Sequence, residues 1–95
     1  MALLLAHLLK WRFQTERRSV SWRATIREQR KAIKRRIERT PSLTRSLSDS
    51  DWVEDAWLDA RIQAAHETGL PFDHFPEFLP WGMGDILSVD WLPPD

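Results

Sequence analysis

The chain has 95 residues, no cysteine, six tryptophans and a formal net charge of zero. A chain of this length fits one small domain, and the lack of cysteine excludes disulfides, thiolate chemistry and cysteine-based zinc sites. The zero net charge hides a division. Residues 1–45 hold thirteen Lys or Arg against three Asp or Glu, whereas residues 46–95 hold one against eleven.

The first predicted element is a helix over residues 3–13 that is apolar on nearly every side. Its polar members, His7, Lys10 and Arg12, do not share one face, and such a helix needs neighbours on several sides. The apolar run lacks the charged start of a signal peptide. It covers about 12 Å, far short of a ~30 Å hydrocarbon core. We therefore expect a buried helix, no membrane association and, with no cysteine, a cytoplasmic protein.

A second helix is predicted over residues 22–39, with Ser21 as its N-cap. Its apolar stripe is formed by Trp22, Ile26, Gln29, Ile33 and Ile37, a spacing typical of a core-facing helix. The neighbouring face is basic and consists of Arg23, Arg27, Arg30, Lys31 and Lys34.

A third helix is predicted over residues 41–68, with Thr40 as its cap, a break near residues 48–50 and a stop at Gly69. Ala56, Ala60 and Ala64 recur every four residues, which allows another helix to approach closely.

The last segment, residues 71–95, holds five of the six prolines and five of the ten Phe and Trp side chains. We expect an irregular strap across the helical body, with a short helix over residues 83–89. The predicted fold is therefore all-α: a small three-helix bundle in one domain, residues 1–95, with a Pro- and aromatic-rich C-terminal strap and a short fourth helix.

Several ordered blocks resemble a bacterial family known as domain of unknown function 29. The early blocks are residues 7–11 (His-Leu-Leu-Lys-Trp), 16–19 (Glu-Arg-Arg-Ser) and 21–23 (Ser-Trp-Arg), and the later blocks are 41–43 (Pro-Ser-Leu), 59–61 (Asp-Ala-Arg) and 67–71 (Glu-Thr-Gly-Leu-Pro). The resemblance implies an all-helical fold and a bacterial origin, but no reaction. Because family members usually carry two further helices before this segment, the resemblance also implies that the chain is the later part of the domain.

The basic residues form the first candidate site. The candidate nucleic-acid or anion ligands are Arg17, Arg18, Ser19, Ser21, Arg23, Arg27, Arg30, Lys31 and Lys34. The cations of the second helix could meet phosphates. Alternatively they pair with Asp51, Glu54, Asp55 and Asp59 of the third helix, or remain solvated. The zero net charge favours neutralisation within the chain. The preceding loop could likewise be an anion pocket or, as we expect, an N-capping loop.

Asp55, Asp59 and His66 form a second candidate, because they lie on one strip of the third helix and could share a cation. No HExxH or EF-hand pattern accompanies them, so a solvated acidic face is the better interpretation. We expect no metal, no cofactor and no catalytic residue.

The leading functional hypothesis is a non-enzymatic helical protein-interaction module. Its partner, a second copy or a separate polypeptide, is expected to cover the apolar first helix and the alanine ridge. The predicted contacts are Leu4, Leu5, Leu8, Trp11, Ala56, Ala60 and Ala64. The alternative is a small nucleic-acid-binding or regulatory protein that uses the basic face of the second helix. A hydrolase or metal enzyme ranks last.

Overall fold

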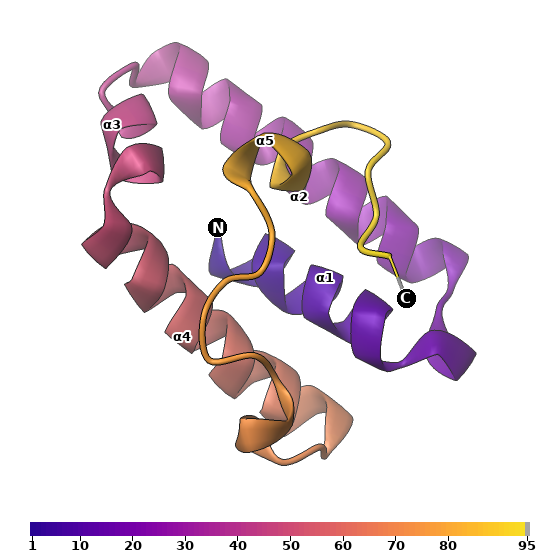
Figure 1. Ribbon diagram of the computed structural model, residues 1–95. Helices are drawn as coiled ribbons and strands as arrows, with labels where there is room; N and C mark the ends of the chain where they lie inside the picture. The colour runs from indigo at the N-terminus through magenta and orange to yellow at the C-terminus, as the bar shows by residue number, and fades with distance from the viewer. Residues whose placement is uncertain (95) are drawn as a thin grey trace.

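The computed structural model describes residues 1–94 and contains no strand among them, which confirms the all-α prediction (Figure 1). Two single 3₁₀ turns, Thr15–Arg17 and Phe72–His74, join longer elements. The α-helices are α1 (Ala2–Phe13), α2 (Val20–Arg39), α3 (Leu43–Ser48), α4 (Ser50–Thr68) and α5 (Met83–Ile86). None of the helices described is both long and apolar enough to cross a membrane.

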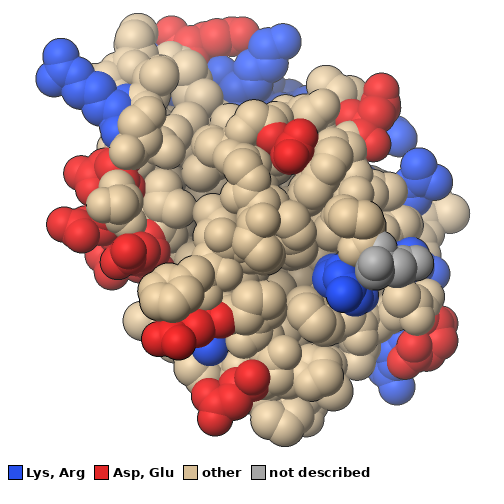
Figure 2. All heavy atoms as spheres, viewed as in Figure 1, with Lys and Arg blue, Asp and Glu red and all other residues tan. Residues whose placement is uncertain are grey.

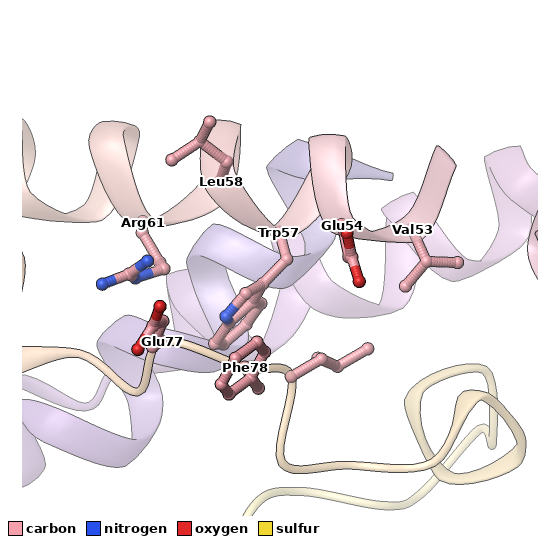
Figure 3. A pocket seen from close by; sticks show the side chains of 8 residues that line it. Val53, Glu54, Trp57, Leu58, Arg61, Glu77 and Phe78 are labelled. Carbon is pink, nitrogen blue, oxygen red and sulfur yellow. The ribbon is translucent and has the colours of Figure 1, made fainter. Parts of the chain in front are cut away.

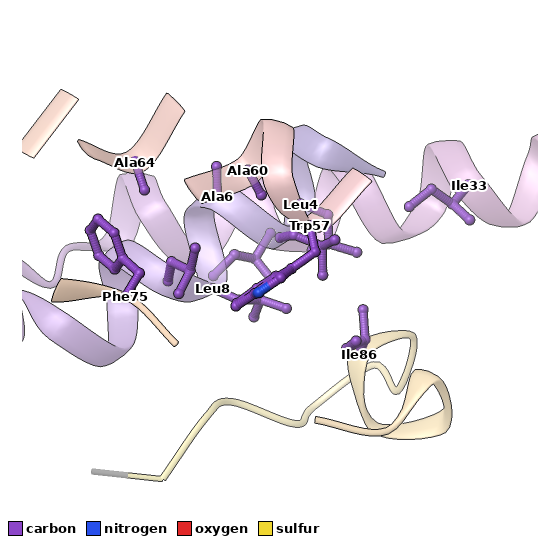
Figure 4. Packing of buried hydrophobic residues seen from close by; sticks show 12 residues of the cluster. Leu4, Ala6, Leu8, Ile33, Trp57, Ala60, Ala64, Phe75 and Ile86 are labelled. Atoms are coloured by element: carbon purple, nitrogen blue, oxygen red, sulfur yellow. The ribbon is translucent and has the colours of Figure 1, made fainter. Parts of the chain in front are cut away.

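Helix α1 is the axis of the protein and lies between α2 and α4 (Figure 1). Seven consecutive residues, from Leu4 to Lys10, are buried. A helix with no polar face must be covered on several sides, and here α2 and α4 flank α1 and the C-terminal strap crosses it. Figure 4 shows Leu4 and Leu8 pointing into the cluster that contains Trp57 of α4 and Ile86 of α5.

The prediction that α1 and the alanine ridge face a partner is therefore wrong. Leu4, Leu5 and Leu8 are 0% exposed, as are Ala60 and Ala64 of α4. Trp11 and Ala56 are partly buried against the same cluster. The chain shelters these side chains itself, because the small alanines let α4 lie close to α1.

The polar residues buried in α1 are accommodated one by one. The Lys10 ammonium donates to the Glu67 carboxylate of α4 at 3.0 Å and lies 5.4 Å from the centre of the Trp22 ring of α2. His7 Nδ1 donates to the Leu3 carbonyl at 3.0 Å. Both buried polar side chains of α1 therefore have a partner, which is what makes their burial tolerable.

Helix α2 begins two residues earlier than predicted. Ser19, not Ser21, is the N-cap, and its hydroxyl accepts the backbone N–H of Trp22 at 3.1 Å. Either serine has a hydroxyl that can cap a helix. The turn at residues 15–17 precedes the helix, and Ser19 is the serine that lies at the helix start. At the other end the Thr40 N–H closes the helix on the Arg36 carbonyl at 2.8 Å.

The predicted third helix is two helices. Asp49 has an extended backbone, and its side chain accepts the N–H groups of Asp51 and Trp52, so α3 ends there and α4 starts as a newly capped helix. The break expected near residues 48–50 is confirmed. Helix α3 starts at Leu43 rather than Pro41 because residues 41 and 42 form a turn. Gly69, at φ +75°, ends α4 as predicted.

The strap is held by aromatic contacts and hydrogen bonds rather than by regular structure. The Trp57 indole N–H donates to the Pro76 carbonyl at 3.0 Å, and the Trp81 ring lies edge-on to both Trp57 and Trp91. Helix α5 spans four residues, Met83–Ile86, and is shorter than the predicted 83–89. It has no side-chain cap, so the burial of Ile86, which is 0% exposed, anchors it.

The basic face of α2 and the acidic side of α4 do not neutralise each other through paired side chains, which corrects the expectation from the zero net charge; Lys10 of the basic half pairs instead from α1 with Glu67 of the acidic half. Within residues 1–94, no ion pair joins α2 to α4; the pairs present are Lys10–Glu67 and Lys31–Glu28. The reason is geometric, because α1 separates the two helices. Figure 2 shows acidic side chains gathered along the left edge, over α4, and most basic ones along the top and right.

Candidate functional site

Helix α2 is the most exposed long element of the protein. Of its twenty residues only Ile26, Arg30 and Ile33 are buried. Four members of the predicted basic face are exposed: Arg23, Arg27, Lys31 and Lys34. An ion pair on this face, Lys31 with Glu28 at 3.8 Å, is itself exposed and contributes little stability. The face is therefore a band of available positive charge.

Beside this band lies an open groove of about 560 Å³ between α2 and the chain that follows α5, called here the α2 groove. Its apolar floor is formed by Ile33 and Ile37 of α2 with Leu87 and Val89 of the strap. Val89 is 73% exposed. The remaining lining residues are charged: Arg27, Arg30, Lys31, Lys34 and Glu38. Exposure of the apolar floor to water is unfavourable, and an exposed apolar surface with a polar rim is typical of an interaction site.

Arg30 builds one wall of this groove. Its guanidinium is buried and donates to three strap carbonyls: from Nε to Ile86 at 2.8 Å, from Nη1 to Val89 at 3.2 Å and from Nη2 to Trp91 at 2.7 Å. Burial lowers the pKa of Arg30, and the nearby charge of Asp90 opposes that shift. The structure therefore gives Arg30 a different position from its neighbours on the predicted basic face: it ties the strap to α2.

The loop before α2 has the form of a capping loop. The Ser19 hydroxyl is occupied by the cap, and Arg18 Nε donates to the Trp11 carbonyl at 2.7 Å. The guanidinium groups of Arg18 and Arg23 lie 4.9 and 6.0 Å from the centre of the Trp11 ring. Arg17 and Ser21 are exposed. The structure thus brings Arg18 and Arg23 of this set to Trp11.

The acidic candidates stay on the surface of α4. Asp55, Asp59 and His66 are exposed. Among residues 1–94, no three His, Cys, Asp or Glu side chains are placed so that they could hold a metal ion together. The strip therefore offers negative charge without a chelating geometry.

A smaller hollow of about 200 Å³ lies between α4 and the strap (Figure 3). Trp57 points from α4 toward Phe78 of the strap, and Arg61 and Glu77 lie at one end of the hollow. The Arg61 guanidinium stacks 4.0 Å from the centre of the Phe72 ring and is buried. This hollow belongs to the seam that holds the strap on α4.

Only the α2 residues of the groove floor could be identified from the sequence. The helical spacing places Ile33 and Ile37 on a core-facing stripe, yet Ile37 is only partly buried and lines the groove. Leu87 and Val89 come from the strap, some fifty residues later in the chain. The sequence marks Leu87 and Val89 only as two apolar residues after a short predicted helix, which is a weak signal for a groove.

These features define a small all-helical protein whose distinguishing surface is an apolar groove with a basic rim. The family model described as "Domain of unknown function DUF29" matches residues 1–92. The chain belongs to this family. The match covers nearly the whole chain, so the predicted family is confirmed, whereas the restriction to the later part of the domain is not what the match shows. Comparison with curated proteins and with solved structures gave no significant match.

Proposed function

We propose that this protein is a non-enzymatic helical interaction module, and that the α2 groove receives an amphipathic helix of a protein partner. A ligand complementary to the groove has apolar side chains over Ile33, Ile37 and Leu87 and acidic side chains beside the rim. Docking of such a helix in a groove is a recurrent mode of recognition, read as apolar anchors at helical spacing. The cytoplasmic location expected from the sequence stays a prediction.

One observation carries this proposal: the cations on the rim are exposed and, within residues 1–94, have no acidic counterpart on α4. Arg27, Lys31 and Lys34 border a floor that the chain leaves open. An acidic partner would meet the cations with opposite charge, which speeds encounter and fixes register. Apolar contact with the floor would supply most of the affinity.

The test is binding of a synthetic peptide that forms a helix with leucines on one side and glutamates on the flanks. Fluorescence anisotropy is measured with the intact chain at low salt. The Lys31→Glu, Lys34→Glu double variant is expected to weaken binding at least about tenfold, because two attractive contacts become repulsive. A peptide with the same residues in scrambled order is expected to bind much more weakly.

A matched control is available on the same helix. Arg35 and Arg39 are exposed and do not line the groove. The Arg35→Glu, Arg39→Glu variant changes the net charge equally but leaves the rim intact, so it should keep most of the affinity. Equal losses in the two double variants, or no binding by the unaltered chain, would contradict the proposal.

A second candidate function is nucleic-acid binding, favoured by the exposure of Arg23 and Arg27 at the N-terminal half of α2. Here affinity for duplex DNA or RNA should fall steeply as salt rises, because phosphate contacts release counterions. The informative variant is Arg23→Glu, Arg27→Glu, since Arg23 lies outside the α2 groove. Absence of binding at low salt would end this candidate.

A further inference from the structure

Helix α4 carries an outward surface that complements the α2 groove. Leu58 and Ile62 are 45% and 53% exposed, and Figure 3 shows Leu58 pointing away from the strap. Asp51, Asp55 and Asp59 are exposed on the same side of the helix, since their spacing places them within about 80° of one another. Within residues 1–94 none of these carboxylates makes an ion pair. These five residues are called here the α4 face.

The two surfaces match in chemistry and in length. The α4 face presents two apolar side chains flanked by carboxylates, and the α2 groove presents an apolar floor flanked by Arg27, Lys31 and Lys34. Residues 51–62 and residues 27–38 each cover about 16 Å of helix axis. The α4 face therefore has the pattern that the proposed function asks of the partner helix.

The α4 face cannot reach the groove of its own chain. Helix α1 lies between α2 and α4 (Figure 1), and residues Leu4 to Lys10 of α1 are buried there. Each folded chain consequently displays both halves of a complementary pair and can join them only with another copy.

We infer that the α4 face of one copy docks in the α2 groove of a second copy, an inference that rests on the proposed function of the groove. The division of charge supports a second copy over an unrelated protein. The chain carries thirteen cations against three acids in its first half and eleven acids against one cation in its second. The surplus of each half is therefore equal and opposite, which suits contact between the basic half of one copy and the acidic half of another.

The contact is between different surfaces on the two partners, so each bound copy keeps one unused groove or face, and association is head-to-tail. A contact based on one helix is smaller than a standard interface of about 1,600 Å², so the association should be weak and concentration-dependent. It should also weaken at high salt, because the Debye length falls to about 3 Å at 1 M.

The experiment is analytical ultracentrifugation of the intact chain and of two one-sided variants. The groove variant is Lys31→Glu, Lys34→Glu, and the face variant is Asp55→Lys, Asp59→Lys. The unaltered chain should increase in average mass with concentration at low salt, whereas each variant alone should remain monomeric. An equimolar mixture of the variants should associate again, because the unaltered α4 face of the groove variant fits the unaltered groove of the face variant, and the two reversed surfaces are complementary as well.

A further variant combines all four substitutions in one chain. It should associate again, since both charges of each contact are reversed together. The altered side chains are exposed, and circular dichroism melts verify that each variant is folded. This design distinguishes loss of the contact from loss of the fold.

The outcomes separate this inference from the proposed function. A chain that stays monomeric at the highest attainable concentration, while it still binds the acidic helical peptide, overturns the second-copy inference and leaves a separate protein as the partner. Self-association without complex formation in the variant mixture also overturns it, because the contact would then lie elsewhere. Loss of peptide binding with mutual association of the variants would instead count against the groove as a general helix receptor.

Discussion

Helices α1 and α2 lie against each other, but one is almost wholly inside the protein and the other almost wholly at its surface. Seven consecutive residues of α1 are buried, whereas α2 buries three of twenty. The two helices therefore have different roles: α1 forms the core around which the chain folds, and α2 provides surface charge and one side of an open groove. Substitutions in the two helices should therefore have different consequences.

The largest expected effect is loss of an α1 core side chain. Leu8→Ala should lower the free energy of unfolding by about 2–5 kcal/mol, because Leu8 is 0% exposed and the cavity cannot fully collapse. Chemical denaturation followed by tryptophan fluorescence measures the change. Leu8→Met, a nearly volume-conserving change in the same helix with an expected loss below about 1.5 kcal/mol, serves if the alanine variant does not fold.

The control for that prediction is Leu58→Ala on the exposed side of α4. Leu58 is 45% exposed, so its removal should change the stability by no more than about 0.5 kcal/mol. If Leu8→Ala had an effect as small as Leu58→Ala, α1 would not be the core of the fold.

The next effect concerns the one buried cation of α2. Arg30→Met keeps the aliphatic stem but removes the donors to the carbonyls of Ile86, Val89 and Trp91. We expect a loss of about 2–3 kcal/mol, because charged donors contribute more than neutral ones. Hydrogen exchange should also become faster in residues 86–92. Arg27→Met, almost one turn earlier and exposed, should leave both quantities nearly unchanged; equal effects would contradict the tie between α2 and the strap.

A smaller effect is expected at the end of α4. Gly69 has φ +75°, a conformation that costs a residue with a side chain about 1–2 kcal/mol. Gly69→Ala should therefore destabilise the protein by about that amount. Gly84 has no positive φ, and a methyl group added there would meet no atom within 4 Å, so Gly84→Ala should be neutral or slightly stabilising. Thermal melts of the two variants make the comparison.

Acid should weaken the core helix through its two polar contacts. Burial lowers the pKa of His7 from its ordinary 6.5, and the charge of Lys10 lowers it further, against the opposing effects of the Leu3 carbonyl and Glu67. Burial acts to raise the pKa of Glu67, but the hydrogen bond and charge of Lys10 outweigh it, so that pKa lies below its ordinary 4.5. Both groups are then more readily protonated in the unfolded chain.

Each group therefore stabilises the folded chain fully at a pH above its pKa in the unfolded chain. This stabilisation is lost as the pH falls through the pKa of the group in the folded chain. The melting temperature should therefore decrease first below pH 6.5, from His7, and further below pH 4.5, from Glu67. His7→Gln should flatten the first part of the curve, whereas the same change at the exposed His66 should not. A profile that rises on acidification would contradict this assignment.

The course of the chain could largely be predicted from the sequence, because it depends on local signals. The apolar surround of residues 3–13, the break near Asp49 and the stop at Gly69 are all readable from residue type and spacing. What shelters the first helix could not be predicted, since that depends on how α2, α4 and the strap come together. Sequence alone therefore assigns the surplus of apolar surface to a partner instead of to the chain itself.

The candidate site shows the same limit. The cations of α2 can be identified from their spacing, but Arg30 lies at the edge of the apolar stripe on a helical projection, and only the position of the strap decides that it is buried. The groove floor joins Ile37 to Leu87 and Val89, which are distant in sequence. Zero net charge is also misleading, because a sum over the chain says nothing about which helices are neighbours.

The claim that the exposed cations of α2 do not hold the fold together is tested most directly by the unfolding free energy of the Lys31→Glu, Lys34→Glu variant. Within residues 1–94, the ion pair lost is the exposed 3.8 Å pair with Glu28, and repulsion along a basic helix is relieved. We expect the variant's free energy of unfolding to lie within about 0.5 kcal/mol of that of the unaltered chain, or slightly above it. A decrease greater than about 1.5 kcal/mol would show instead that these cations hold the fold together.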